Sequence, residues 1–106
     1  MDSFSVRCLF RWAPRDGQRK KHLYEERITL WQAGSEDEAI EAAEREALSY
    51  AGDNAEYLEF CQSYALIDPV VASGVELFSL LRESDLEPEE YIDMFFDTGN
   101  EHERHA

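Results

Sequence analysis

The chain has 106 residues, a length that fits one domain with a single core. Its formal net charge of −14 disfavours binding to nucleic acid and to anionic lipid surfaces, because both are negatively charged. Hydrophobic residues make up 43% of the chain, which argues against disorder, and no apolar run reaches the ~20 residues of a membrane span.

The charge is unevenly distributed. Residues 1–33 carry a net charge of +3, whereas residues 34–106 carry −17. An acidic protein of this kind favours basic partners. The N-terminal residues lack the apolar segment of a secretion signal, so we expect a cytoplasmic protein. We therefore expect Cys8 and Cys61 to be buried, reduced thiols rather than a disulfide.

A β-hairpin is predicted at the start of the chain. Apolar residues alternate with mostly polar ones over residues 3–12, the pattern of a half-buried strand. Turn-forming residues and four cations follow over residues 13–22, which predicts a basic loop. A second strand is expected over residues 23–33.

The pattern favours one register for this hairpin. If Trp12 pairs with Tyr24, the apolar side chains of both strands share one face. A shift by one residue would bring Glu25 and Arg27 to that face instead, so the hydrophobic pattern disfavours it.

The clearest helix follows between Ser35 and Gly52. Ser35 is a suitable N-cap with Glu38 three residues later, and Gly52 is suited to the helix end. The apolar residues that recur at helical spacing and predict its buried stripe are Ile40, Ala43, Ala47, Leu48 and Ala51.

The second half of the chain predicts two more strands and a helix. The strands are expected over residues 57–67 and 75–82, and the helix is expected from Pro88 to Gly99. Strand 75–82 is apolar on both faces, which is typical of a central strand or of one beneath the last helix. The expected core consists of these residues: Ile28, Leu30, Ile40, Leu48, Leu77 and Phe95.

These elements predict an α+β fold with an antiparallel four-stranded sheet in the order β-β-α-β-β-α. At least one face of the sheet is expected to carry a helix. The domain is expected over residues 1–99, followed by a frayed polar tail over residues 100–106.

Several segments resemble a small bacterial family. They are Glu25-Glu26-Arg27-Ile28-Thr29-Leu30-Trp31, Glu38-Ala39-Ile40 with the alanine-rich helix, Phe78-Ser79-Leu80-Leu81-Arg82-Glu83-Ser84-Asp85-Leu86, Pro88-Glu89-Glu90-Tyr91 and Phe96-Asp97-Thr98-Gly99. Together they resemble family number 4288 in the domain-of-unknown-function series, over most of residues 4–104. The resemblance implies a stand-alone bacterial cytoplasmic protein, and it brings no activity, cofactor or catalytic residue with it. Glu87 departs from the pattern, where a better capping residue such as Ser is expected.

Motifs for common chemistry are missing from the sequence. The glycines form no phosphate-binding loop, and the cysteines and histidines form no metal-binding motif. His102 and His105 are three apart, but they fall in the expected tail, where no rigid scaffold would hold a metal. We therefore expect no cofactor, no metal and no assigned catalytic residue.

Glu26 is the one weak candidate for a catalytic group. Its predicted side chain points to an apolar face, where a carboxylate must be paired or take up a proton. One interpretation is a general acid or base in a small pocket. The other is a structural carboxylate bonded to Tyr24, Tyr64 or an arginine, and the sequence favours this one.

Two surfaces are candidates for partner binding. The outer face of the hairpin is expected to present Leu9, Arg11, Arg27 and Trp31, a mixture of residue types that is enriched at binding hot spots. The alternative is that the last helix covers this face. The exposed side of the first helix, with Glu41 and Glu44, is an acidic candidate for docking a basic protein, and the alternative is a solubilising surface.

We therefore predict a non-enzymatic, acidic protein-binding module with a basic protein partner, or one that self-associates. Immunity or antitoxin proteins are the nearest analogy. The alternatives are a small enzyme or ligand-binding domain that uses Glu26, and a homodimeric structural protein whose sheet continues across two chains.

Overall fold

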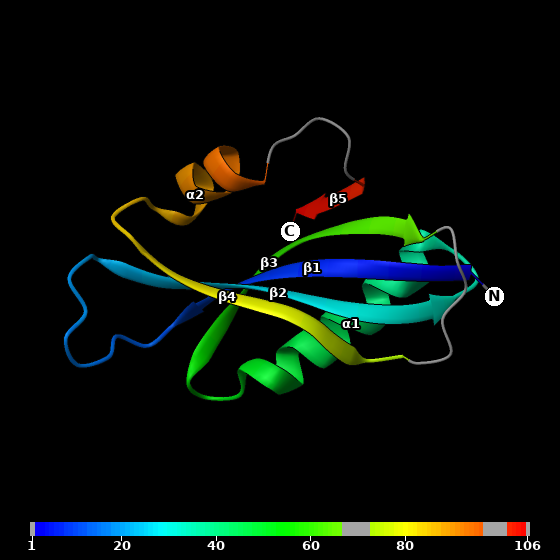
Figure 1. The fold of residues 1–106 in the computed structure, drawn as a ribbon, viewed down its shortest axis with the longest axis horizontal. Coiled ribbons are helices and arrows are strands. Elements are labelled where there is room, and N and C mark those ends of the chain that lie inside the picture. Colours follow the sequence, from blue (N-terminus) through cyan, green and yellow to red (C-terminus); the bar gives the residue numbers. More distant parts are fainter. Residues whose placement is uncertain (1, 67–72, 97–101, 106) are drawn as a thin grey trace.

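The computed structural model describes residues 2–66 and 73–96, together with a strand at residues 102–105. Its elements are β1 (Asp2–Trp12), β2 (His22–Ala33), α1 (Glu36–Ala51), β3 (Ala55–Leu66), β4 (Val75–Ser84), α2 (Pro88–Phe95) and β5 (His102–His105). They form an antiparallel five-stranded sheet in the order β4-β2-β1-β3-β5 (Figure 1). Within the described part, no helix is long and apolar enough to cross a membrane.

The α+β class and the antiparallel sheet are confirmed, but the order differs in detail because a fifth strand follows α2. The expectation of a frayed tail is wrong for residues 102–105, whose backbone pairs with β3. A polar composition does not prevent this pairing, because an edge strand needs only backbone partners on one side. The predicted helix end at Gly99 lies outside the described residues, and α2 is described to Phe95.

The two helices cover opposite faces of the sheet. Behind the sheet in Figure 1, α1 packs over β1, β2 and β3, and α2 lies near the end where the β1–β2 loop projects. Alternate residues of β1 therefore enter two separate cores. Phe4, Val6, Cys8 and Phe10 pack with α1, whereas Leu9 joins the core that α2 covers.

The predicted hairpin register is wrong by one residue. Trp12 pairs with Leu23 and Arg11 pairs with Tyr24, so Glu25 and Arg27 lie on the α1 face, the arrangement that the hydrophobic pattern disfavoured. The physical reason is that both faces of β2 are covered and the charged side chains find partners beneath α1. An apolar pattern alone cannot choose between two covered faces.

The helix α1 forms as its local signals predict. The Ser35 side chain accepts a hydrogen bond from the Glu38 amide at 3.2 Å, and Gly52 ends the helix at a φ of 54°. Its buried stripe is Ala39, Ile40, Ala43, Ala47 and Ala51. The small alanine side chains bring α1 close to the sheet.

Two predicted core residues are wrong. Leu48 is 63% exposed, because it shares a side of α1 with Glu44 and points past the edge of the stripe. Leu77 is also exposed, since β4 is an edge strand rather than a central one. Leu30 and Ile40 are buried as predicted, and Ile28 and Phe95 are half-buried.

Candidate functional site

The carboxylate of Glu26 lies beneath α2 and is only 3% exposed. It accepts hydrogen bonds from the Tyr91 hydroxyl at 2.7 Å and from Arg7 and Arg82. Arg7 comes from β1, Arg82 from β4 and Tyr91 from α2, so three elements converge on one charge. Two cations and a hydroxyl supply the pairing that a buried carboxylate requires.

Two aromatic rings at the end of α2 pack against the two arginines of this network. The guanidinium of Arg7 lies 3.7 Å from the centre of the Phe96 ring, and that of Arg82 lies 3.9 Å from the centre of the Phe95 ring. Cations over aromatic faces are stabilised there by the ring quadrupole. The network therefore fastens α2 to the sheet.

Burial also changes the chemistry of the hydroxyl that binds Glu26. Burial, followed by the bond to Glu26, raises the pKa of Tyr91 well above its ordinary value. Tyr91 is thus a neutral donor at any physiological pH. Glu26 is buried beneath α2 and is not among the residues that line three surface hollows of the described chain, so this arrangement fits a structural carboxylate better than a general acid or base.

The sequence analysis missed a second polar network on the opposite face of the sheet. Glu25 lies under α1 and accepts hydrogen bonds from Trp12 at 2.8 Å, from the Tyr50 hydroxyl at 2.9 and 3.0 Å, and from Ser79. Burial first, then the bond to Glu25, raises the pKa of Tyr50 to about 12. The signal in the sequence was the pair of adjacent glutamates, which must point to opposite faces of a strand.

Arg27 extends this network toward the edge of the sheet. It binds Glu46 of α1 at 2.5 Å and Glu76 of β4 at 2.6 Å, and its guanidinium lies 3.8 Å from the centre of the Tyr50 ring. Arg27 is therefore buried between its partners. A side chain held in this way is not available to bind a protein partner.

The outer hairpin surface that the sequence predicted does not form. Leu9 is fully buried under α2 and Arg27 is buried under α1, on opposite faces of the sheet. Trp31 is half-buried against the α1 core and donates to Thr29 at 2.7 Å. The register shift separates these residues, since it moves every β2 side chain to the face opposite the predicted one.

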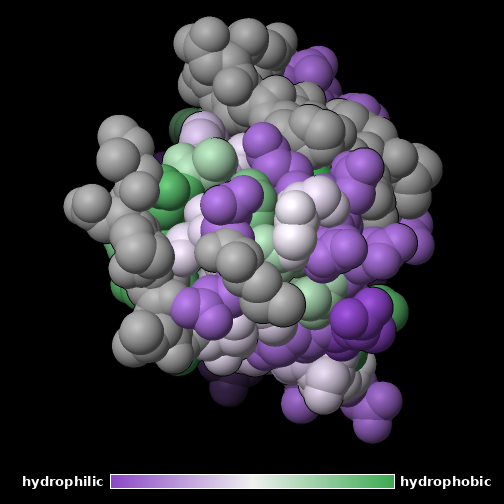
Figure 2. Space-filling model, turned by 90° about the vertical axis from the view of Figure 1, so that its right-hand side faces the viewer, coloured by the Kyte–Doolittle hydropathy of each residue, from purple (hydrophilic) through white to green (hydrophobic). Residues whose placement is uncertain are grey.

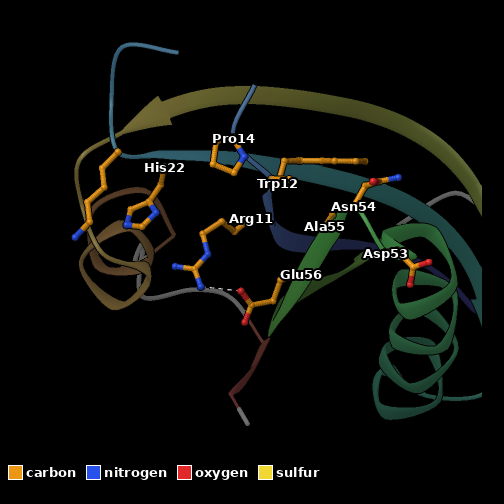
Figure 3. Close-up of a pocket in the computed structure, with 10 residues that line it drawn as sticks. Arg11, Trp12, Pro14, His22, Asp53, Asn54, Ala55 and Glu56 are labelled. Atoms are coloured by element: carbon orange, nitrogen blue, oxygen red, sulfur yellow. Dashed lines mark hydrogen bonds and ion pairs between the residues drawn. The ribbon is translucent and has the colours of Figure 1, made fainter. Parts of the chain in front are cut away.

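Arg11 lines a surface hollow at the end of the sheet instead. The hollow has a volume of about 550 Å³ and lies between β1, the β1–β2 loop and the start of β3 (Figure 3). Its basic side chains are already paired, because Arg11 binds Glu56 at 2.7 Å, and Lys21 and His22 each bind the carboxylate of Glu87 at 2.8 Å. The hollow is therefore weakly suited to binding an anion.

The acidic candidates on α1 differ from each other. Glu41 is exposed, whereas Glu44 is half-buried and accepts a hydrogen bond from Tyr57 at 2.6 Å. Leu48 lies exposed on the same side as Glu44, one helical turn away. Among the described residues visible at the end of the molecule where α1 begins, hydrophilic ones predominate, with smaller apolar areas between them (Figure 2).

The cysteines offer no nucleophile. Cys8 and Cys61 are buried, are not joined by a disulfide, and lie directly opposite each other on β1 and β3. The hydrogen bond with Cys61, together with burial, raises the pKa of Cys8 well above its ordinary value, which disfavours the reactive thiolate. Among the described residues there is also no cluster of acidic, histidine or cysteine side chains that could hold a metal ion.

The edge strand β4 carries more exposed large apolar side chains than any other element of the described structure. Four of its apolar side chains, Val75, Leu77, Phe78 and Leu81, are 44–53% exposed. They stand on an open edge of the sheet, because β4 pairs only with β2 among the described strands. Apolar residues on an unpaired edge are a ready template for a further strand.

No protein-family model, no curated protein and no solved structure matches this chain, so the family resemblance seen in the sequence stays a prediction.

Proposed function

We propose that this chain is a non-enzymatic protein-binding module and that the edge of β4 is its binding surface. The observation that carries the proposal is the set of four apolar side chains on the open edge. Free backbone groups on an edge give affinity for an added strand, and the side chains beside them give specificity. Such a surface needs no cofactor, metal or catalytic residue.

The charge of the chain supports a basic protein among its partners. At −14, the protein attracts basic surfaces over long range and speeds their association. The exposed side of α1, which carries Glu41 and, two helical turns later, the exposed Leu48, is a second surface that suits such a partner. Neutralisation of a toxin with a basic groove, as by an immunity protein, is one role for a module of this kind.

The alternative enzyme function has less support. Glu26 is the only carboxylate that the sequence suggested as a catalytic group, and its bonds to Arg7, Arg82 and Tyr91 occupy it. A general acid or base must reach a substrate proton, and α2 covers this one.

Site-specific photo-crosslinking in extracts of the source cell tests the proposal. A photoreactive amino acid placed at Leu81 should form crosslinks to a protein chain that mass spectrometry can identify. The matched control carries the same group at Tyr64 on β3, which is exposed and separated from β4 by β2 and β1. The same group at the exposed Leu48 probes the second surface on α1. Crosslinks from Leu48 alone would move the binding surface to α1, and none from any position would refute a protein-binding role.

A further inference from the structure

We propose that the occupant of the β4 edge is a second copy of this chain, paired antiparallel through β4 about a twofold axis at Ser79. The pairing would join the two five-stranded sheets into one continuous sheet. It rests on the proposed function above, because it names the partner of the same edge.

The charged residues of β4 leave the centre of its edge free. Glu76 binds Arg27, Arg82 binds Glu26, and Glu83 accepts hydrogen bonds from two backbone amides of the β1–β2 loop at 2.8 and 3.1 Å. Natural edge strands block further pairing with lysine, proline or short length. β4 is ten residues long and contains neither lysine nor proline.

When two copies of β4 are paired, one register places apolar side chains opposite apolar side chains. Paired residues of antiparallel strands share a face, so a twofold axis must pass through a residue and not between two. With Ser79 on the axis, Leu77 of one copy faces Leu81 of the other, and Phe78 faces Leu80. With Leu80 on the axis, Phe78 would instead face the charged Arg82.

The surroundings of β4 leave room for this pairing. The ladder between β2 and β4 is regular from Phe78 to Ser84, and Leu77 is the extra residue of a bulge at its end. Since α1 packs over β1, β2 and β3, the side chains of Leu77 and Leu81 are half exposed beside it. Covering them removes apolar surface from water, which favours association.

The net charge of the chain determines how this dimer should respond to salt. Each copy carries −14, so net repulsion opposes the dimer, and added salt should strengthen it by screening. A complex with a basic partner would respond to salt in the opposite way.

Analytical ultracentrifugation of the full chain over a range of concentrations tests this inference. We expect a mass twice that of the chain, with a dissociation constant that falls as salt is added. Leu77→Lys and Leu81→Glu should each raise the dissociation constant at least tenfold, because each sets a charge against a leucine. The control Leu48→Lys should leave it unchanged, and circular dichroism should show that all three variants are folded.

The mixture of the two variants tests the register itself. In a mixed dimer the Leu77→Lys position of one copy faces the Leu81→Glu position of the other, so mixing should restore dimers that neither variant forms alone. Dimers that persist in both single variants, or a mixture that stays monomeric, would overturn the proposed interface. A wild-type chain that is monomeric at every soluble concentration would overturn the second copy as occupant. The proposed function would then stand only if Leu81 still crosslinks to a different protein.

Discussion

Replacing Glu26 with glutamine tests whether its buried carboxylate stabilises the fold. The substitution keeps the shape of the side chain but removes the charge that faces Arg7 and Arg82. Removal of one partner from a fully buried pair costs about 3–5 kcal/mol. The side chains of Arg7 and Arg82 are 20% and 35% exposed, so water solvates them in part. We therefore expect a loss of about 2–4 kcal/mol in the free energy of unfolding.

Urea unfolding followed by circular dichroism measures this loss. The transition midpoint should fall while its slope stays constant, because the exposed surface of the unfolded chain does not change. In a thermal scan each kcal/mol corresponds to about 4–8 °C for a domain of this size. The loss is a large share of the ~5–15 kcal/mol of an ordinary domain.

The matched control is Glu25→Gln, on the neighbouring residue and the opposite face. The carboxylate of Glu25 accepts hydrogen bonds from the neutral donors Trp12, Tyr50 and Ser79. Because the amide oxygen of glutamine can still accept hydrogen bonds there, we expect a loss of only about 1–2 kcal/mol in the free energy of unfolding. A double-mutant cycle of Glu26→Gln with Arg7→Gln should show a coupling of about 1–3 kcal/mol. A Glu26→Gln variant that loses no more stability than Glu25→Gln, or a coupling near zero, would contradict the assigned network.

Three further outcomes follow from burial and backbone geometry. Ile40→Ala should lower the free energy of unfolding by about 2–5 kcal/mol, whereas Leu48→Ala should change it by less than about 0.5 kcal/mol, as urea unfolding of both variants will show. Glu59 has a φ of 57° in the β3 bulge, so Glu59→Gly should be more stable than Glu59→Ala by about 1 kcal/mol, and equal stabilities would argue against strain there. Burial raises the pKa values of Tyr24 and Tyr50 to about 12, so the unfolded chain loses these protons first. The stability that these tyrosines contribute is complete below pH ~10 and falls as the pH rises toward 12. The urea midpoint should therefore be lower at about pH 11 than at about pH 9, and an unchanged midpoint would refute this.

The sequence predicted the local elements because their signals are local. The cap at Ser35, the stop at Gly52 and the alternation in β1 each depend on a few neighbouring residues, and the structure places the elements within a few residues of the expected bounds. The same pattern predicted that Glu26 would lie on a buried face, bonded to Tyr24, Tyr64 or an arginine, and the structure selects arginines together with Tyr91. Its arginine partners, Arg7 and Arg82, were not identified, since they come from strands whose order the sequence does not reveal.

The register of the hairpin could not be predicted from hydrophobicity. Both faces of β2 are covered, so a one-residue shift exchanges one buried face for another instead of exposing an apolar one. The choice depends on where Glu25 and Arg27 find partners, and those partners lie on α1 and β4. The predicted hairpin surface failed for the same reason, because its residues divide between the two faces.

Buried charges and exposed apolar residues both depart from the usual distribution in a folded chain, and in this chain they have different explanations. The buried Glu25, Glu26 and Arg27 are satisfied by partners within the chain, so their burial is accounted for by the fold itself. The apolar side chains of β4 have no such account among the described residues, because α1 packs over the other strands and the outer edge is unpaired there. The apolar pattern of residues 75–82 predicted a central or covered strand, and this prediction is wrong for a single chain, in which β4 is an edge strand. The prediction becomes correct if a further strand pairs with the free edge, because β4 is then a central strand. The function of this protein is therefore to be sought at the β4 edge, where the fold alone does not explain the sequence, and not at Glu26, where it does.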